Sequence, residues 1–364
     1  MRICQCTTVH KREDLRVFYK TSVTLAKAGH EVYLIVADGK GDEKKYGVSI
    51  IDLGNYNRKR KERITVARKL LFNKIKSLCP DVVQLHDPEL LTLTSKLKNA
   101  GFKVVYDSHE DVTKQIQYKE WLGPSFMRNM FSKLYDLWEK GRVEKVDALI
   151  SVIDEITNKF QCKKKVTIKN FPIIDTFYSK CKPWNERANN LVYVGTFSEK
   201  RGVLDYVNAL KYVKSDCRLL LIGKFDSSIF EEKCKNSDGW SKVDLIGFQP
   251  MEEVAKYLGN SKIGLSVLHP EKNYLTSLPT KGFEYMAAGT PVLMSDFEYW
   301  RPYFSDSARF ISPNDPVLLA RNIDELLMDE NELVQLHENC KKDFKKYSWE
   351  EESKKLLELY DYLS

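Results

Sequence analysis

The chain has 364 residues, of which 43% are hydrophobic and 12% aromatic, and its net charge is +7. This length exceeds what one hydrophobic core usually supports, so two domains are expected. No run approaches 18 consecutive apolar residues, which excludes a membrane-crossing helix. The eight cysteines show no CxxC pair and no spacing suited to zinc, and the polar N-terminus does not resemble an export signal. Scattered thiols of this kind predict a cytoplasmic location.

The positive charge is concentrated in the first half. Residues 1–170 contain 33 Lys and Arg against 21 Asp and Glu, a net of +12, whereas the remainder contains 25 against 30, a net of −5. This asymmetry predicts an anionic partner for the first half. A nucleic acid is disfavoured, because no known nucleic-acid-binding module is present and the second half is acidic.

Strand and helix patterns alternate from the start of the chain, which predicts a parallel sheet with helices on both faces. The expected strands of the first half are residues 1–9, 31–37, 48–53, 82–85, 103–107, 148–152 and 166–168. The expected helices are residues 18–27, 63–77, 90–99 and 124–143.

Two of these helices carry possible interaction surfaces. The basic run from Arg58 to Lys76 has apolar residues at helical spacing, so it suits an anionic membrane surface, or it is an ordinary helix that covers the sheet. Residues 124–143 offer a second apolar surface, for which a sheet-covering helix is the favoured interpretation. Its apolar side chains are Phe126, Met127, Met130, Phe131, Leu134 and Trp138.

The alternation stops at residues 173–189, which predict a linker, and then restarts. The expected strands of the second half are residues 191–194, 219–222, 243–245, 263–267, 292–294 and 308–311. A last helix covers residues 349–363, with Ser348 as its N-cap and Glu351 at the capping-box position. The fold class is therefore α/β, with doubly wound domains at residues 1–172 and 190–348.

Polar side chains follow several strands of the first domain. His86 and Asp87 follow the strand at 82–85, and His109 and Glu110 follow the strand at 103–107. Because the carboxyl ends of parallel strands meet at one edge, these side chains are expected to line one cleft. The loop over residues 7–16 adds His10 and Arg16, which either reach a ligand there or belong to a solvated charged loop.

The second domain contains a loop after its first strand that suits an anion. The loop holds Gly195 and Thr196, and Lys200 and Arg201 follow before Gly202. The planar guanidinium of Arg201 suits two phosphate oxygens, with Lys200 as a further cation. The alternative is that both cations belong to a solvated turn.

Residues 277–292 predict a loop, a short helix and a buried strand. Ser277, Leu278, Pro279 and Thr280 precede or begin the helix and leave its first amides free for an anion. Lys281 adds a cation where a helix built for stability would carry an acid, and Glu284 is placed to accept hydrogen bonds from sugar hydroxyls. The alternative is an ordinary amphipathic helix before a core strand.

Two further positions lie at the carboxyl ends of expected strands. Gly223 ends one core strand, and residues 247–250 end the next. Open α/β sheets bind their ligands at this edge. Phe248 is interpreted either as a packing residue or as a side chain that stacks on a base.

Residues 284–292, Glu-Tyr-Met-Ala-Ala-Gly-Thr-Pro-Val, resemble the signature of the family 4 retaining glycosyltransferases of the bacterial surface-polysaccharide type. The resemblance implies the GT-B fold, in which two Rossmann-like domains face a cleft, residues 349–364 pack back on the first domain, and the 247–250 loop passes near the base. The segment before His109 is similar to the family's Asp-x-His motif. That motif implies that His109 donates to the donor as charge develops, together with Arg201 and Lys281.

The chain departs from the family at two charged positions. Thr196 stands where the family usually carries an arginine, and Thr276 stands where the first of two acids is expected. Asn273 or Glu271 is the available substitute for that acid. Asn273 with the following Ser-Leu-Pro-x-Lys resembles a variant within the family.

The predicted reaction is retaining transfer of a hexosyl or N-acetylhexosaminyl group from a nucleoside-diphosphate sugar to a hydroxyl of a lipid-linked glycan or polysaccharide. The resemblance implies that the leaving diphosphate helps to deprotonate the acceptor. No cofactor is expected, and no metal, because no Asp-x-Asp triad occurs. The alternative is an inactive nucleotide-sugar-binding subunit; an NAD enzyme is disfavoured because no GxGxxG follows the first strand. A cytoplasmic protein, peripheral on the inner face of the membrane, is expected.

Overall fold

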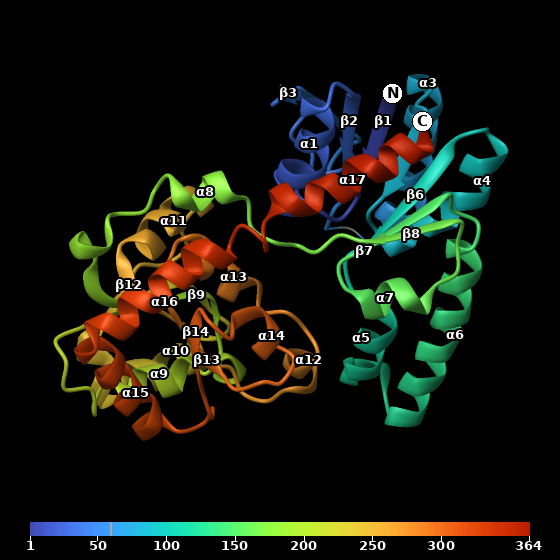
Figure 1. Cartoon of the computed structure of the whole chain (residues 1–364). Coiled ribbons are helices and arrows are strands. Elements are labelled where there is room, and N and C mark those ends of the chain that lie inside the picture. Colours follow the sequence, from blue (N-terminus) through green and yellow to red (C-terminus); the bar gives the residue numbers. More distant parts are fainter. Residues whose placement is uncertain (59) are drawn as a thin grey trace. The chain divides into compact units, whose positions relative to one another are not determined.

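The computed structural model describes residues 1–58 and 60–364, which divide into two compact units (Figure 1). The first unit comprises Met1–Asn170 and Glu352–Ser364, and the second comprises Phe171–Glu351. Each unit contains its own parallel sheet with helices packed against it, so the α/β, doubly wound fold class is confirmed. The described residues contain no helix with both the length and the apolar character needed to cross a membrane.

The first unit contains an eight-stranded sheet in the order β3-β4-β2-β1-β5-β6-β7-β8. Every pair is parallel except β3 and β4, and the sequence did not predict β3. Strand β1 lies between β2, which follows it in the sequence, and β5, which pairs with its other edge. The strands are β1 Arg2–Cys6, β2 Glu31–Val36, β3 Glu43–Lys45, β4 Val48–Asp52, β5 Val82–Leu85, β6 Lys103–Ser108, β7 Ala148–Ser151 and β8 Lys164–Thr167.

The helices of the first unit begin with an eight-residue π-helix, η1, where an α-helix was predicted. The basic segment forms α2, η2 and α3, and Leu71 and Ile75 of α3 are fully buried in the core. The sheet-covering interpretation of this segment is therefore confirmed, with Lys59 outside the described residues. The helices are η1 Leu15–Ser22, α1 Val23–Lys27, α2 Arg60–Glu62, η2 Arg63–Ala67, α3 Arg68–Leu78, η3 Pro88–Leu93, α4 Thr94–Asn99, α5 Val112–Tyr118, η4 Glu120–Leu122, α6 Ser125–Val143 and α7 Asp154–Lys159.

Helix α6 differs from the favoured interpretation of residues 124–143. Only its C-terminal end meets the core of the first unit. There Val143 is buried, and Trp138 packs against the apolar cluster that also contains Leu71 and Ile75 of α3. Along the rest of α6 the large apolar side chains are exposed, Phe126 by 70%. The physical reason is that the helix packs against its neighbours through its polar side, where Ser132 and Glu139 are buried.

The second unit contains a six-stranded parallel sheet in the order β11-β10-β9-β12-β13-β14. Apolar clusters lie on both sides of it, one including α9 and α15 and the other α11 and α13. The order in which strands are added to the sheet reverses between β9 and β12, and such a switch point is where doubly wound sheets bind ligands. The strands are β9 Ala188–Phe197, β10 Arg218–Phe225, β11 Val243–Leu245, β12 Ser261–Ser266, β13 Val292–Ser295 and β14 Ala308–Ile311.

The segment 173–189 is not irregular. It contains two short helices, and Phe177 of the first is buried in the core of the second unit. The helices of the second unit are α8 Ile174–Tyr178, η5 Trp184–Glu186, η6 Glu199–Arg201, α9 Val203–Ala209, α10 Ser228–Lys235, η7 Asp238–Lys242, α11 Met251–Gly259, α12 Lys272–Leu275, α13 Thr280–Ala287, α14 Arg301–Phe304, α15 Pro316–Met328 and α16 Glu330–Asp343.

The last helix, α17 (Trp349–Leu363), begins in the second unit and ends in the first. Ser348 caps it, because its Oγ accepts a hydrogen bond from the Glu351 amide at 3.3 Å, as predicted. Tyr360 of this helix is fully buried beside β1 and β5. Its hydroxyl lies 2.6 Å from Gln84 Oε1 and 3.1 Å from Gln5 Nε2.

Candidate active site

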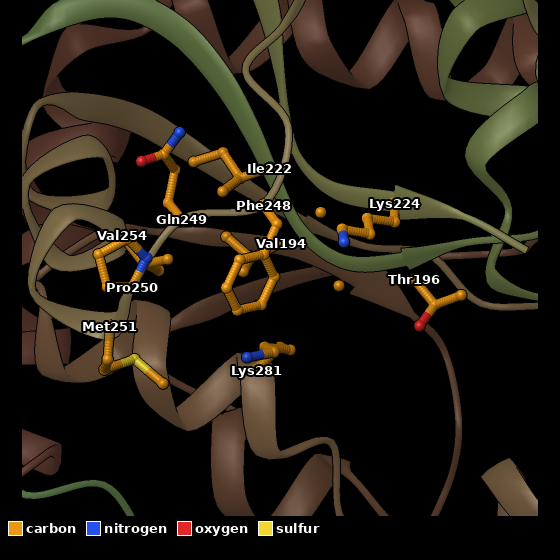
Figure 2. Close-up of a pocket in the computed structure, with 12 residues that line it drawn as sticks. Val194, Thr196, Ile222, Lys224, Phe248, Gln249, Pro250, Met251, Val254 and Lys281 are labelled. Carbon is orange, nitrogen blue, oxygen red and sulfur yellow. The ribbon is translucent and has the colours of Figure 1, made fainter.

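A pocket of about 420 Å³ lies at the carboxyl edge of the second unit's sheet (Figure 2). It is formed by the ends of β9 and β10, the loop after β11 and the starts of α11 and α13. We name it the second-unit pocket. Five residues singled out from the sequence line it, namely Gly195, Thr196, Gly223, Phe248 and Lys281.

The second-unit pocket combines an apolar floor with two cations. Val194, Ile222 and Val254 supply buried apolar surface. The Phe248 side chain is 71% exposed, and the Lys224 Nζ lies 5.6 Å from its ring centroid. Figure 2 shows Phe248, Lys224 and Lys281 around the same space. Phe248 is therefore not packed into the second unit, and its exposed ring beside an apolar floor is available to stack on a planar ligand.

Two glycines bring β9 and β10 close together at the pocket. Gly223 is the partner of Gly195 in the parallel register, and its φ of 149° suits glycine. A Cβ at Gly223 would lie 1.8 Å from the Gly195 carbonyl oxygen, so no other residue fits. The Arg201 guanidinium lies beside Gly195, where a Cβ would be 3.1 Å from Nη1. Backbone groups and a guanidinium are thus accessible at one strand end.

Arg201 stays charged although it is half-buried. Burial lowers its pKa, but the neighbouring Tyr193 and Tyr274 outweigh that effect, and the net shift is upward. Arg201 is therefore not part of an ordinary solvated turn, which corrects one of the two sequence interpretations. Lys200 does fit that interpretation, because it is exposed and lies 3.5 Å from Glu271.

Helix α13 starts as the sequence predicted. Pro279 is its N-cap and provides no side-chain hydrogen bond, and the first turn contains no acid. Its first amides therefore remain available, and the helix dipole adds positive potential there. Lys281 Nζ lies 2.8 Å from Glu284 Oε2, and Glu284 is only 7% exposed. The two side chains are thus one ion pair, whereas the sequence suggested two separate contacts.

Several predicted binding residues do not line the second-unit pocket. Asn273 and Thr280 are exposed on α12 and α13. Ser277 offers its carbonyl oxygen to Trp300 Nε1 at 2.8 Å, and Leu278 packs against the core. Pro279 serves as the N-cap of α13.

The sequence interpretation missed Lys224, which lines the pocket, whereas Gln249, which also lines it, belongs to the predicted 247–250 loop. Lys224 follows Gly223 directly at the end of β10, and its register partner on β9 is Thr196. The sequence did contain a signal for Lys224, because it follows Gly223, which is predicted to end a strand at the ligand-binding edge of the sheet. The pairing of Lys224 with Thr196 is a long-range property that requires the sheet register.

The first unit places three histidines at the carboxyl edge of its sheet, as predicted. His86 Nδ1 lies 3.2 Å from His109 Nε2, and the rings of His10 and His109 are 4.9 Å apart. His86 Nε2 contacts Gln5 Oε1 at 2.7 Å. His86 is fully buried, which lowers its pKa, whereas His109 keeps 15% of its side chain exposed. His109 is thus held by the buried His86 and still faces outwards.

Arg16 is a buried residue of η1 rather than part of a solvated loop. Its Nη2 donates to Asp107 Oδ1 at 2.8 Å, and its Nη1 donates to the Ile168 carbonyl at 3.0 Å. Burial raises the pKa of Asp107, but Arg16 and His109 outweigh it and keep the pKa well below its usual range. Asp107 is therefore a fixed negative charge behind His86 and His109, from which its Oδ2 lies 3.4 Å in each case.

Asp87 is also buried, with 1% of its surface exposed. Both of its oxygens accept hydrogen bonds, from the hydroxyls of Thr7 and Thr8 at 2.8 and 2.9 Å and from the Thr8 amide. It therefore fixes the loop that carries His10. Glu110 is exposed and interacts with Gln115.

His86, Asp107 and His109 lie close enough for a metal site, with one potential ligand atom from each within 4.8 Å of the others. Two contacts argue against this use. Both nitrogens of His86 already have protein partners, and the guanidinium of Arg16 binds Asp107. A cation placed there would meet that guanidinium, so the donor set fits a hydrogen-bonded cluster better than a metal centre.

Two models of glycosyltransferase families match the chain. The family model described as "Glycosyltransferase Family 4" matches residues 16–167, and that of "Glycosyl transferases group 1" matches residues 175–343. Together they cover most of both units. The chain belongs to these glycosyltransferases. The glycosyltransferase thus transfers a sugar from a nucleotide-sugar donor, and the GT-B expectation is confirmed.

Solved structures share the whole fold of this glycosyltransferase. Sucrose-phosphate synthase from Thermosynechococcus elongatus matches with a TM-score of 0.73 at 18% identity, over 100% of this chain and 98% of that one. A glycosyltransferase from Rickettsia africae gives 0.72 at 18%, with the same coverage. HepE from Anabaena in complex with UDP gives 0.73 at 10%, over 99% of this chain and 100% of that one. No sequence among the curated proteins matches the chain.

Proposed function

We propose that this glycosyltransferase moves a hexosyl or N-acetylhexosaminyl group, with retention and without a metal, from a nucleoside-diphosphate sugar to a hydroxyl of a lipid-linked glycan or polysaccharide of the cell envelope. The observation that carries the proposal is the second-unit pocket, where an exposed aromatic ring and an apolar floor adjoin Lys281 and the uncapped start of α13. An aromatic platform suits a base, and a helix start with a lysine suits a diphosphate.

The donor is proposed to bind with its base on Phe248 and its diphosphate at α13. Lys281 and Arg201 would neutralise the phosphoryl oxygens, and Glu284 would accept hydrogen bonds from sugar hydroxyls. Ser277, Leu278, Pro279 and Thr280 contribute as the segment that shapes the helix start. The HepE structures contain UDP and UDP-glucose, and these ligands support a uridine nucleotide with glucose or a related hexose.

Lys224 is proposed to replace the cation that the family carries at Thr196. The two residues are register partners at the ends of β10 and β9, so their side chains leave the sheet on the same side. Lys224 lines the same pocket as Thr196 and Lys281. The pocket therefore keeps two lysines although position 196 is uncharged, which favours an active enzyme over an inactive binding subunit.

The proposed chemistry breaks the bond between the anomeric carbon and the diphosphate oxygen and forms a bond from that carbon to the acceptor oxygen. The acceptor proton passes to the departing diphosphate, so no separate base is needed. Arg201, Lys281 and the α13 amides stabilise the charge that develops on the diphosphate. His109 is proposed to donate a hydrogen bond to the donor, with His86, Asp87, Arg16 and His10 positioning it and Glu110 contacting the acceptor.

A thermal-shift screen followed by a turnover assay tests the proposal. UDP-, GDP-, ADP- and dTDP-sugars are compared at equal concentration, since a ligand that binds the folded protein raises its Tm by mass action. We expect the largest rise with a UDP-sugar, followed by release of UDP with a suitable acceptor. No shift with any of the four would contradict the donor site. A shift without turnover for any acceptor would support the inactive subunit.

We further propose a cytoplasmic protein at the inner face of the membrane. The segment from Arg58 to Lys76 supports this mainly through charge, because Leu71 and Ile75 of α3 are buried in the unit's own core, and only Val66 and Leu70 are exposed, by 42% and 38%. The exposed lysines on α3, Lys69 and Lys76, would then contribute positive charge to the contact.

A further inference from the structure

The α5–η4–α6 segment, Val112 to Val143, presents a reversed arrangement of polar and apolar side chains. Before its C-terminal end, where Trp138 and Val143 meet the core, the face of α6 that packs on the protein buries polar side chains. Ser132 Oγ donates to the Thr113 carbonyl at 2.9 Å, and Lys159 Nζ donates to Glu139 Oε2 at 3.0 Å. A soluble helix normally buries its apolar face and exposes its polar one. Here the opposite is found.

The exposed face of α6 is continuous and apolar. Phe126, Met130, Leu134 and Leu137 are exposed by 70%, 49%, 57% and 69%, respectively. Their spacing of four, four and three residues places them along one side of the helix. Trp121 of η4 and Tyr118 of α5 extend the same kind of surface, with 71% and 55% exposure. We name these six residues the α6 apolar face, on a helix that Figure 1 shows projecting from its sheet with α5.

The charges around the α6 apolar face define its partner. Residues 114–133 contain four cations, Lys114, Lys119, Arg128 and Lys133, and a single acid, Glu120. Among the described residues, Lys119 and Lys133 have no ion-pair partner, and both are exposed. Tryptophan and tyrosine favour the boundary between lipid tails and head groups, and lysines favour anionic head groups. An apolar helix face with such a rim is typical of a helix that lies in a membrane surface.

A second copy of the chain fits this surface less well. In a two-fold dimer the same patch packs on its own copy, so the cationic rim that contains Lys119 and Lys133 would face a second cationic rim. The cores of protein interfaces are also depleted of lysine. The cations therefore favour an anionic partner over self-association.

We propose that the α6 apolar face docks on an anionic lipid bilayer, with Phe126, Leu134 and Leu137 at the boundary between head groups and acyl chains and Lys119 and Lys133 on the phosphates. This assignment places the apolar contact with the membrane on α6, whereas the segment from Arg58 to Lys76 contributes mainly positive charge. It does not depend on the proposed transferase reaction, because lipid binding requires neither donor nor acceptor.

Co-sedimentation of the full chain with vesicles tests this inference. Phosphatidylcholine vesicles are compared with vesicles of phosphatidylcholine and phosphatidylglycerol. The double variant Phe126→Ser/Leu137→Ser should lower binding to the anionic vesicles by about tenfold or more, because two large apolar side chains are lost. Lys119→Ala and Lys133→Ala should each lower it about fivefold, and added salt should weaken binding by the wild-type chain.

The matched control is Ile229→Ser/Met328→Ser, which removes two apolar residues of the second unit that are exposed by 81% and 70%. The control should bind like the wild type, and circular dichroism should show that all variants are folded. Lys69→Ala/Lys76→Ala removes the two exposed lysines of α3 and tests that helix in the same assay. The inference is overturned if the wild type does not bind anionic vesicles, or if only the α3 variant loses binding. It is also overturned if Phe126→Ser/Leu137→Ser abolishes a dimer instead.

Discussion

Lys281 Nζ lies 2.8 Å from Glu284 Oε2, one turn apart on α13, and the carboxylate of this pair is nearly buried. The pair places a cation at the second-unit pocket and fixes its position, because Glu284 cannot turn towards water. A bound diphosphate would compete with Glu284 for Lys281. That exchange would release the carboxylate to accept hydrogen bonds from a sugar.

Replacement of Lys281 or Glu284 by alanine should abolish measurable turnover while the protein stays folded. Loss of one preorganised cation at a developing charge typically lowers kcat by about 10²–10³-fold. The matched control is Lys256→Ala on α11, whose ion pair with Glu253 is also three residues apart but exposed on both sides. This variant should keep full activity, because surface pairs contribute only about 0–1 kcal/mol. Normal turnover in Lys281→Ala would contradict the proposed diphosphate contact.

Phe248→Ala should weaken donor binding, measured by calorimetric titration with the best nucleotide sugar of the screen. Stacking of a base on an aromatic ring is worth about 1–3 kcal/mol, so Kd should rise by about 5- to 150-fold. Phe248→Tyr keeps the ring and should bind almost as the wild type does. Because Phe248 is exposed, the folded protein should lose little stability in either variant. An unchanged Kd in the alanine variant would contradict stacking of the base on Phe248.

Gly223→Ala should disrupt the second-unit pocket. Its Cβ would overlap the Gly195 carbonyl oxygen, and the positive φ adds strain of about 1–3 kcal/mol. We expect a lower Tm and loss of the donor-induced thermal shift. The control is Gly141→Ala on α6, where a Cβ would meet nothing within 4 Å. That variant should be neutral or slightly stabilising, since alanine favours a helix.

Much of this architecture could be predicted from local patterns. The convergence of His86 and His109 follows from strand order alone, because parallel strands end at the same edge. The uncapped start of α13 is visible in the sequence, since Pro279 offers no capping group.

The features that could not be predicted depend on long-range partners. Arg16 is buried because Asp107, far away in the sequence, neutralises it. The position of Lys224 beside Thr196 depends on the register of two strands. The exposure of the apolar face of α6 could not be predicted, because apolar residues at helical spacing fit both a buried face and an interaction surface.

Tyr360→Phe should lower kcat more than it changes KM. The Tyr360 hydroxyl bonds to Gln84 and Gln5, and Gln5 in turn contacts His86, which holds His109. Loss of the hydroxyl leaves Gln5 Nε2 and Gln84 Oε1 with only their mutual contact at 3.4 Å, and such loss of a buried hydrogen-bond partner costs about 1–3 kcal/mol. A positioning role should also shift the pH profile of kcat, which a purely structural loss would not.

The control for Tyr360 lies on the same helix. Tyr362 is 57% exposed, and Tyr362→Phe retains the ring that lies against Lys164. This variant should match the wild type in kcat, KM and pH profile. A Tyr360→Phe enzyme with a reduced Tm and unchanged kinetics would argue against the positioning role.

The stability of the first unit should depend on pH through His10 and His86 with opposite signs. Burial lowers the pKa of His10, but Asp14, Asp87 and Asp107 outweigh it, so the net shift is upward. The folded state then binds the proton more tightly, and this stabilisation is complete below about pH 6.5 and lost as pH rises through the folded pKa. Burial lowers the pKa of His86. For this residue the unfolded state binds the proton more tightly, so stability falls as pH drops below about 6.5.

Calorimetric scans of His10→Gln and His86→Gln at about pH 8 and at about pH 5.5 separate the two effects. His10→Gln removes a side chain whose protonation stabilises the folded state. The deficit in Tm of this variant relative to the wild type should therefore grow as pH falls. His86→Gln removes a buried group that must stay neutral, so its deficit should shrink over the same range. The opposite slopes distinguish titration from simple loss of contacts, which would lower Tm equally at both pH values. Parallel curves for the two variants would therefore refute this account of the histidine cluster.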